Sequence, residues 1–280
     1  MNHKVLLLGE PGVGKSTCGL SYPGVEQHVF GSTEEVTAKG FIGRKDILPF
    51  VKFQWRDCYT DKDIVAMAKV KKDEDPLTQE KLLAPYAAKA KARNVKKYID
   101  YLEELESNVK AGKRPELKAI FLDNWTPFAE DLWTYTEVVY GDQYSEKEQF
   151  KIWSDYTSVC DRVLDLMNTI ELHAVISCHV SMALDEETSA KVSFFDQAKV
   201  ANKKDWEPFM LSKYKFRLAG KFDYAFQLFT EEVLGQKNKY WAVPKKARIN
   251  PFGPGKIMVP KGTFYQFLED ALNKQQGGSK

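Results

Sequence analysis

The chain has 280 residues, 43% of them hydrophobic and 29% charged, so it can bury one large core, and we expect one principal domain. It contains no apolar run of about eighteen residues and no signal-peptide pattern at its start, which argues against a secreted or membrane-spanning class and predicts a soluble, cytoplasmic protein. Its four cysteines are widely scattered, which argues against a zinc site or a disulfide framework and predicts reduced thiols.

The formal net charge of +2 hides an uneven distribution along the chain. Residues 191–280 contain 17 Lys and Arg against 8 Asp and Glu, so the remainder of the chain is net negative. A basic C-terminal third suits a polyanionic partner such as nucleic acid. A solvated basic surface is the open alternative.

The first half of the chain begins with a short apolar run at residues 4–8, typical of a strand buried on both faces of a parallel sheet. A glycine-rich loop and a short helix from about residue 16 follow, and Tyr22-Pro23-Gly24 ends that helix. A second strand is predicted over residues 27–32. Residues 61–114 are highly charged and helical in character, which predicts a helical insertion that packs outside the sheet.

The middle of the chain repeats the order of apolar strand, polar end and helix. An apolar strand over residues 119–123 ends in Asp123, a long amphipathic region covers residues 128–168, and a further strand over residues 173–179 ends in His179. This rhythm predicts an α/β fold with a mostly parallel, twisted sheet flanked by helices. Ligands of such sheets bind beyond the carboxyl ends of the strands.

The last part of the chain contains a polar stretch at residues 181–210 that is too long for an ordinary connection. Two later strands are predicted over residues 222–229 and 240–243, joined as a hairpin. A helix over residues 263–272 and a frayed tail follow. We therefore expect residues 1–250 to form the core and residues 251–280 to form a C-terminal helix and flexible tail.

The motif that carries most chemistry is G-x-x-x-x-G-K-[ST], placed between a strand and a helix. Glycines let backbone N–H groups point at phosphate oxygens, and the start of a helix favours negative charge. Lys15 is expected to reach the β- and γ-phosphates of ATP, and the Ser16 hydroxyl to ligate Mg²⁺. The alternative is a glycine turn with an exposed lysine. The predicted nucleotide-binding residues are Gly9, Glu10, Pro11, Gly12, Val13, Gly14, Lys15, Ser16 and Thr17.

Asp123 ends its strand in the manner of a Walker B acid, whose carboxylate holds hydrated Mg²⁺. Asn124 follows it, so no second carboxylate adjoins Asp123 to orient the attacking water. Glu34 is the predicted general base, because a position on a strand beside the P-loop strand would bring it near the γ-phosphate. Glu35 competes for this role, and two solvated carboxylates are the alternative.

Two further sets of residues are candidates for catalysis. His179 is placed to hydrogen-bond the γ-phosphate and report its loss, although an ordinary hydrogen-bonded histidine fits the pattern nearly as well. Lys245, Lys246 and Arg248 follow a late strand and are candidates for stabilising transition-state charge in a neighbouring subunit; surface lysines are the alternative.

The candidate nucleic-acid surface is the long stretch at residues 181–210, where cations alternate with aromatic residues. Single strands are bound by phosphate contacts together with stacking of bases on aromatic rings. The same aromatic residues would also serve to pin the loop to the core. The residues of this candidate DNA loop are Lys191, Phe194, Phe195, Lys199, Lys203, Lys204 and Trp206.

Together these residues resemble the RecA-like P-loop core, in particular the phage-encoded ATP-binding family related to RecA and RadA that includes single-strand annealing proteins. The stretch Val29–Glu34 is similar to the strand that carries the family's catalytic glutamate, and residues 120–123 are similar to its Walker B strand. The phosphate sensor falls at His179, where RecA has glutamine. The resemblance covers about residues 5–248 and is one of motif order.

The resemblance implies a Mg²⁺-dependent ATPase that binds single-stranded DNA in phage recombination or annealing, in the host cytoplasm. It also implies a homo-oligomeric ring or filament, and a phage single-strand DNA-binding protein as a partner. Two other functions remain open: a nucleotide or small-molecule kinase with residues 61–114 as its lid, and a nucleotide-gated assembly protein with slow hydrolysis. A kinase lid is usually rich in arginine, whereas this segment offers only Arg93 and Arg114.

Overall fold

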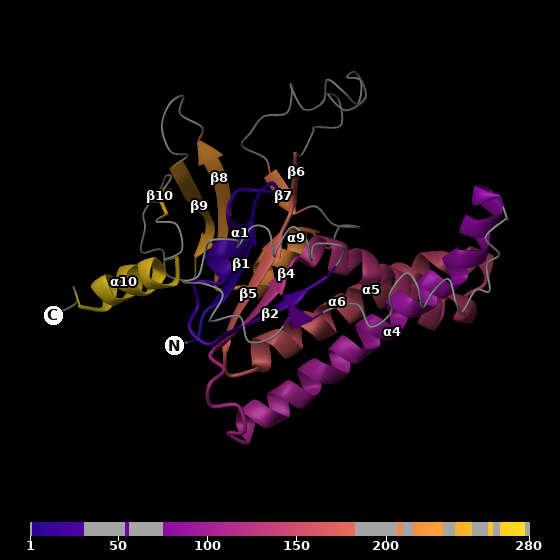
Figure 1. Cartoon of the computed structure of the whole chain (residues 1–280), viewed down its shortest axis with the longest axis horizontal. Coiled ribbons are helices and arrows are strands. Elements are labelled where there is room, and N and C mark those ends of the chain that lie inside the picture. The colour runs from indigo at the N-terminus through magenta and orange to yellow at the C-terminus, as the bar shows by residue number, and fades with distance from the viewer. Residues whose placement is uncertain are drawn as a thin grey trace.

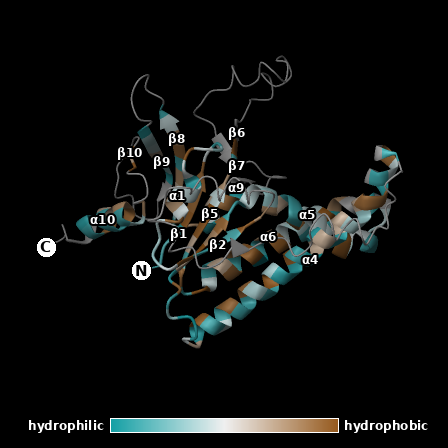
Figure 2. Cartoon of the chain, in the orientation of Figure 1, coloured by the Kyte–Doolittle hydropathy of each residue, from teal (hydrophilic) through white to brown (hydrophobic). Residues whose placement is uncertain are grey.

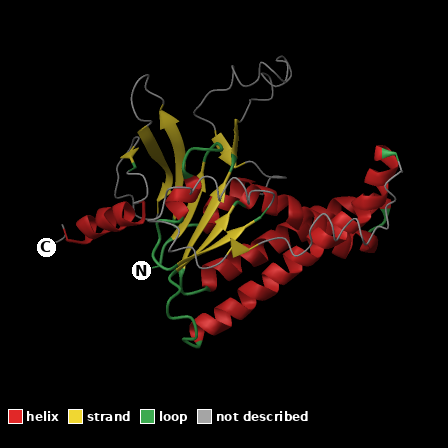
Figure 3. Cartoon of the chain, in the orientation of Figure 1, coloured by secondary structure: helices red, strands yellow, loops and turns green. Residues whose placement is uncertain are grey.

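The computed structural model describes residues 2–30, 54–55, 75–182, 206–208, 215–231, 239–247, 257–259 and 264–277. A mostly parallel sheet lies between helices on its two faces (Figures 1 and 3). This arrangement confirms the predicted α/β class with a mostly parallel sheet flanked by helices. None of the helices in these described ranges is long and apolar enough to cross a membrane.

The main sheet has eight strands in the described part of the chain, in the order β10-β9-β8-β1-β5-β4-β2-β3. Six of them pair in parallel: β3 (Gln54–Trp55), β2 (Val25–Val29), β4 (Ala119–Asp123), β5 (His173–Cys178), β1 (Lys4–Leu8) and β8 (Tyr224–Glu231). The strands β9 (Lys239–Ala247) and β10 (Ile257–Met258) continue the sheet in antiparallel pairing. The carboxyl ends of the six parallel strands therefore share one edge.

Alternate residues of the central strands face two separate cores, because successive side chains of a strand point to opposite faces of its sheet. Leu6 and Leu8 of β1 belong to the core under α4, α5 and α6. Val5 and Leu7 belong to the core that includes Cys18 of α1 (Lys15–Gly19) and residues of α10 (Phe264–Gly277). Both faces are apolar, so β1 reads as a continuous hydrophobic run in the sequence (Figure 2).

The first core is covered by three long helices: α4 (Pro76–Lys110), α5 (Trp125–Tyr140) and α6 (Ile152–Thr169). They pack against one another and extend beyond the sheet as a helical arm (Figure 1). Asp75 caps α4 by accepting from the backbone N–H groups of Leu77 and Thr78, and Pro76 occupies the first turn, where its missing N–H costs nothing. Within the predicted insertion at residues 61–114, Pro76–Lys110 is therefore helical.

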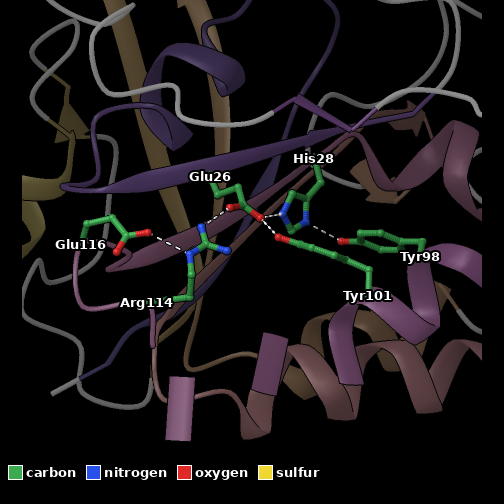
Figure 4. A network of polar contacts seen from close by, with 6 residues as sticks. All are labelled: Glu26, His28, Tyr98, Tyr101, Arg114 and Glu116. Carbon is green, nitrogen blue, oxygen red and sulfur yellow. Dashed lines mark hydrogen bonds and ion pairs between the residues drawn. The ribbon is translucent and has the colours of Figure 1, made fainter. Parts of the chain in front are cut away.

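The strand β2, between β4 and β3, docks on α4 through a buried polar network (Figure 4). Glu26 lies at the centre and contacts the ring of His28, the hydroxyl of Tyr101 and the guanidinium of Arg114. The other ring nitrogen of His28 lies 2.8 Å from the hydroxyl of Tyr98. Burial opposes ionisation of Glu26, but the hydrogen bonds from His28, Tyr101 and Arg114 outweigh it and lower its pKa to about 2.

Short elements complete the described chain. The 3-10 helices η2 (Gly141–Gln143) and η3 (Glu146–Lys151) lie between α5 and α6, and α9 (Lys215–Leu218) and η4 (Ala219–Lys221) precede β8. A separate two-stranded sheet pairs β6 (Val180–Met182) with β7 (Trp206–Pro208). The two ends of the predicted long loop thus lie side by side.

Several sequence-based expectations need correction. The second strand covers Val25–Val29, not residues 27–32. Because β4 and β5 lie between β2 and β1, the expectation that this strand lies beside the P-loop strand is wrong. Lys245 and Lys246 lie within β9 and do not follow it. The final helix continues to Gly277, through residues expected in a frayed tail. The domain division at residue 250 remains a prediction.

Candidate functional site

The loop after β1 is shaped by glycines that no other residue would replace without strain or collision. Gly12 and Gly14 have φ of 84° and 94°, in the left-handed region that favours glycine. A Cβ at Gly9 would lie 2.7 Å from the carbonyl oxygen of Leu228, on the neighbouring strand β8. The backbone N–H of Gly9 also donates to the carbonyl oxygen of Cys178 at 3.2 Å. The loop is therefore fixed between the ends of β8 and β5.

Lys15 lies inside this loop, with 6% of its surface exposed. Its Nζ donates to the carbonyl oxygens of Gly9 and Glu10, both at 2.8 Å. Burial lowers the pKa of the Lys15 ammonium to about 8, although Asp123, Cys178 and Glu10 favour its charged form. The hydrogen-bond partners of this buried ammonium include two neutral carbonyl oxygens, and a polyphosphate that enters the loop would offer it anionic oxygens in their place.

Asp123 ends β4, and its carboxylate is held from both neighbouring strands. Oδ1 accepts from the hydroxyl of Ser177, on β5, at 2.7 Å, and Oδ2 accepts from the side-chain amide of Gln27, on β2, at 3.0 Å. All three residues are buried. Each oxygen keeps acceptor capacity beyond these single hydrogen bonds, so the carboxylate is both oriented and able to hold a cation.

The residues after β4 and β5 complete the floor of the site. The side chain of Asn124 accepts from the backbone N–H of Thr126 at 2.8 Å and so caps α5. The hydroxyl of Thr126 accepts from the backbone N–H of His179 at 3.1 Å. The Nδ1 atom of His179 lies 3.4 Å from Nζ of Lys15, and burial, followed by the charge of Lys15, lowers the pKa of the imidazole. His179 therefore lies at the P-loop lysine as a neutral ring.

The donors present fit a nucleoside triphosphate with Mg²⁺. Ser16 is half-buried in the first turn of α1, and Asp123 supplies a held carboxylate, so both offer the oxygen ligands that Mg²⁺ prefers. No group of three or more His, Cys, Asp or Glu side chains able to hold a metal occurs among the described residues. An ion that keeps waters and takes substrate phosphates needs no such cage.

A small apolar cleft adjoins the loop on the side of β9. It is lined by residues of the loop and α1, by Leu228, by Val259, and by Tyr240 and Trp241 of β9. The Tyr240 ring lies about 3.6 Å from where a Cβ on Gly14 would be, so it packs directly against the loop. Thr17 and Val13 face the same cleft from the P-loop side.

The other predicted site residues are placed as follows. Glu34, Glu35 and Arg248 lie outside the described residues. In the candidate DNA loop, Trp206 belongs to β7, and the other six residues named for it also lie outside the described ranges. The β8–β9 register places Lys246 opposite Ala225, which itself pairs with Leu6 in the middle of β1. The backbone at Lys246 therefore lies level with the middle of β1 and not at the loop edge of its own copy.

Sequence comparison identifies the family. The family model described as AAA domain matches residues 1–249, which include every element from β1 to β9. The chain belongs to the AAA domain family. No curated protein matches the sequence.

Membership of the AAA domain family implies binding and hydrolysis of ATP, usually with Mg²⁺. It supports the P-loop nucleotide-binding part of the sequence resemblance and carries nothing specific to RecA or to phages. In this AAA domain, Lys15 offers a cation for the phosphates, and Ser16 and Asp123 offer oxygen ligands for Mg²⁺.

Sequence reasoning missed Gln27 and Ser177 as members of the site. Both are polar residues within predicted buried strands, which was a usable signal, since an unpaired polar group in a buried strand is costly. Their partner remained hidden because it depends on the order of the strands. Gln27 reaches Asp123 only because β2 lies beside β4.

Proposed function

We propose that this protein is a Mg²⁺-dependent ATPase whose hydrolysis is coupled to the binding of single-stranded DNA. The observation that carries the ATPase part is the convergence of Lys15 and Asp123 at one edge of the sheet. The buried ammonium lies in the loop after β1, and the oriented carboxylate ends β4, with only β5 between those strands. DNA coupling is the finer part of the proposal.

Each residue of the site has a distinct task in this scheme. Lys15 exchanges the carbonyl oxygens of Gly9 and Glu10 for phosphate oxygens, which restores full charge pairing to a buried ammonium. Ser16 and Asp123 would hold the cation, and Mg²⁺ bound there would neutralise charge on the phosphate oxygens. Neutral His179, beside Lys15, is placed to donate or accept one hydrogen bond at the phosphate end.

Glu34 is the proposed general base. The chain leaves β2 beside Asp123, because the backbone N–H of Phe30 donates to the carbonyl oxygen of Asp123 at 3.3 Å. Glu34 follows four residues later in the sequence, which gives it a starting point at the correct edge of the sheet. A Glu34→Gln protein is expected to keep its affinity for ATP and to lose turnover. Retained turnover would remove Glu34 from this role.

DNA coupling is supported by where the candidate DNA loop begins and by its charge. β6 starts one residue after His179, so the loop leaves the sheet directly from the proposed phosphate sensor. Pairing of β6 with β7 holds the two ends of the loop together. The basic C-terminal third of the chain suits a polyanion. We place this activity in phage recombination or annealing, in the host cytoplasm, alongside a phage single-strand DNA-binding protein.

The deciding experiment is steady-state ATP hydrolysis with Mg²⁺, measured with and without single-stranded DNA. Lys15→Ala serves as the inactive blank, and Lys113→Ala, which removes an exposed lysine between α4 and β4, serves as the matched control. Stimulation by DNA that is lost with Lys15→Ala supports the proposal. Hydrolysis that DNA does not stimulate would contradict DNA coupling. Transfer of phosphate to an added nucleotide would show that the protein is a kinase and not an ATPase.

A second candidate is a nucleotide-gated assembly protein with slow hydrolysis. The observation in its favour is that Asn124, next to Asp123, is used to cap α5 and supplies no second carboxylate. If ATP binds but is turned over equally slowly by wild-type and Glu34→Gln proteins, this candidate gains. Equilibrium binding of a fluorescent ATP analogue, compared with turnover, separates it from the ATPase.

A further inference from the structure

The helical arm ends, away from the sheet, in a surface that presents apolar side chains to solvent. Lys91 of α4 pairs with Asp131 of α5, and Tyr98 contacts Phe128, so the two helices run in opposite directions and α4 begins beside the end of α5 (Figure 1). In the described part of the chain, every exposed large hydrophobic side chain except Met258 belongs to this end of the arm. They are Leu77, Leu82 and Tyr86 on α4, Val138 and Val139 on α5, Phe150 on η3 and Trp153 on α6. A concentrated set of exposed apolar groups marks an interaction site.

Part of this surface is hollowed into an apolar groove, where α5 ends, η2 and η3 turn, and α6 begins. The groove has a volume of about 470 Å³, which lies in the size range of ligand sites. Aromatic rings make up much of its lining, and Glu137 is its charged member. We call it the tip groove, defined by Trp133, Glu137, Tyr144, Phe150, Ile152 and Trp153.

Several walls of the tip groove are held in place by contacts within the arm. The rings of Trp133 and Trp153 pack with centroids 4.2 Å apart, and the hydroxyl of Tyr144 donates to the carboxylate of Asp155 at 2.6 Å. Phe150, by contrast, is 68% exposed. Binding against walls that are already ordered costs little side-chain entropy, and aromatic residues commonly carry most of the binding energy of an interface.

Charge around the tip groove restricts what can bind there. Residues 130–155, which span most of α5, η2, η3 and the start of α6, contain 7 Asp and Glu against 2 Lys. Lys151 is already paired with Glu148, whereas no ion pair engages Glu137 or Asp142 among the residues that the structure describes. An acidic rim of this kind repels nucleic acid and anionic lipid surfaces and favours a cationic partner.

The secondary structure around the tip groove restricts the form of that partner. Within the described ranges, this end of the arm consists of helices and offers no strand edge to which an extended segment could add. A hydrophobic groove between helices suits the apolar face of an amphipathic helix, whose side chains at positions i, i+3, i+4 and i+7 act as anchors. Basic side chains that flank such a face would meet Glu137 and Asp142.

We propose that the tip groove is the docking site for a basic amphipathic helix of a partner protein. Apolar side chains of that helix contact Trp133, Trp153 and Phe150, and its lysine and arginine side chains face the acidic rim. The groove lies at the far end of the arm from the sheet that carries Lys15 and Asp123 (Figure 1). Docking therefore goes beyond the proposed ATPase and does not depend on hydrolysis.

The proposal is tested with a fluorescently labelled synthetic helix built from leucine and lysine, whose binding to the full chain is followed by fluorescence anisotropy. Two comparison peptides separate the two parts of the recognition: one has glutamate in place of every lysine, and the other has glutamine in place of every leucine. We expect the leucine and lysine helix to bind at least about tenfold more tightly than either comparison peptide. High salt should weaken its binding.

Variants of the protein assign this binding to the tip groove. Phe150→Ala and Glu137→Lys should each weaken binding of the leucine and lysine helix about tenfold or more. The matched controls are Met258→Ala, which truncates an exposed apolar side chain on β10, and Glu171→Lys, which reverses an exposed charge after the end of α6. Both controls should bind like the wild type. Thermal unfolding followed by circular dichroism checks that every variant is folded, so the test is independent of ATP hydrolysis.

A photo-crosslinking amino acid, benzoylphenylalanine, at position 150 locates the peptide directly, and we expect it to join the leucine and lysine helix. The proposal is overturned if the wild type does not bind this helix, if the glutamate peptide binds equally well, or if both groove variants bind like the wild type. Links from position 150 to this chain or to a second copy, in place of the peptide, would mean that the protein covers its own groove. Binding of phosphatidylcholine vesicles that Phe150→Ala abolishes, without binding of the peptide, would mean a membrane contact.

Discussion

At the scale of single residues, the site depends on how the Asp123 carboxylate is oriented. Ser177 and Gln27 each bind a different oxygen of this carboxylate, and they come from the strands on its two sides. Neither residue needs to contact the nucleotide in order to matter. Groups that orient a metal ligand commonly change metal affinity or activity when they are removed.

Removing either positioning group should raise the concentration of Mg²⁺ that the protein needs. Gln27→Leu and Ser177→Ala each leave one oxygen of a buried carboxylate without its partner, and we expect a shift of about tenfold or more in the half-maximal Mg²⁺ concentration. A Mg²⁺ titration of ATP hydrolysis measures it. Gln266→Leu, on the exposed face of α10, is the control and should leave the Mg²⁺ requirement unchanged. If Gln27→Leu needed no more Mg²⁺ than the wild type, Gln27 would have no positioning role.

The same residues explain what the sequence can and cannot predict about the site. Lys15 and Ser16 are predictable because the motif is local, and a strand, a glycine loop and a helix start follow one another within the sequence. The partners of Asp123 are not, since Gln27 lies 96 positions away and contacts Asp123 through sheet order alone. A run of apolar residues indicates a buried strand but does not indicate which strand lies beside it.

At the scale of elements, the position of β2 is set by its contacts with α4 and with the segment before β4. Gln27 faces Asp123, while its neighbours Glu26 and His28 face the opposite side, toward Tyr98 and Tyr101 of α4 (Figure 4). The alternation of a strand thus lets β2 support the site on one face and hold the arm on the other.

Breaking the central ion pair of this network should strongly destabilise the fold. Arg114 Nη2 lies 2.7 Å from Glu26 Oε2, and only 1% of the Glu26 side chain is exposed. Arg114→Met leaves the buried carboxylate without its cation, and we expect a loss of about 3–5 kcal/mol in the free energy of unfolding. Chemical denaturation measures it. The double variant Glu26→Met/Arg114→Met should lose less free energy of unfolding than the two single variants lose in sum. A loss equal to that sum would show that the pair is not coupled.

The amino-terminal edge of the sheet gives a second prediction, on pH. The Nδ1 atom of His173 accepts from the backbone N–H of His3 at 3.0 Å, so protonation at that atom breaks the bond. Burial, followed by the nearby His3 ring and other cations, lowers the pKa of His173 to about 4. The unfolded chain, at about 6.5, therefore binds more protons between these values, and stability falls as pH drops from 6.5 toward 4.

The difference between wild-type and His173→Asn proteins isolates this contribution. Asparagine keeps an acceptor for the His3 amide and does not titrate. Between pH 6.5 and pH 4, the free energy of unfolding should therefore fall by roughly 2 kcal/mol less in the variant than in the wild type. Denaturation of both proteins across this range gives the measurement. His3, Tyr22, Tyr265 and Glu269 surround the site and are unchanged in the variant. Parallel pH profiles would contradict the assignment.

At the scale of the whole molecule, the layered architecture follows from features that a sequence displays. The apolar runs of β1, β4 and β5 indicate strands covered on both faces, and the helical spacing of Val95, Ile99 and Leu102 indicates a helix that covers one of them. The helical arm does not follow in the same way. Its direction depends on how α4, α5 and α6 pack together, which joins residues far apart in the chain.

The limits of the domain are the last whole-molecule question. Residues 1–249 match the AAA domain, and the sequence favours a separate tail after residue 250, yet α10 completes the core on the α1 face of the sheet. Phe264 and Leu268 are fully buried, and Phe264 lies edge-on to Phe226 of β8 with ring centroids 5.4 Å apart. A chain that ends at residue 250 would expose this face to water.

We therefore expect α10 to be required for a stable fold. Phe264→Ala should lower the free energy of unfolding by about 3–5 kcal/mol, the usual cost of removing a buried aromatic ring, whereas Gln266→Ala on the exposed face of the same helix should change it by less than about 0.5 kcal/mol. Chemical denaturation followed by tryptophan fluorescence measures both. If Phe264→Ala and a protein truncated after residue 250 were as stable as the full chain, residues 1–250 would be an independent domain and α10 an appendage. The burial of Phe264 and Leu268 in one core with Val5 and Leu7 predicts the opposite result.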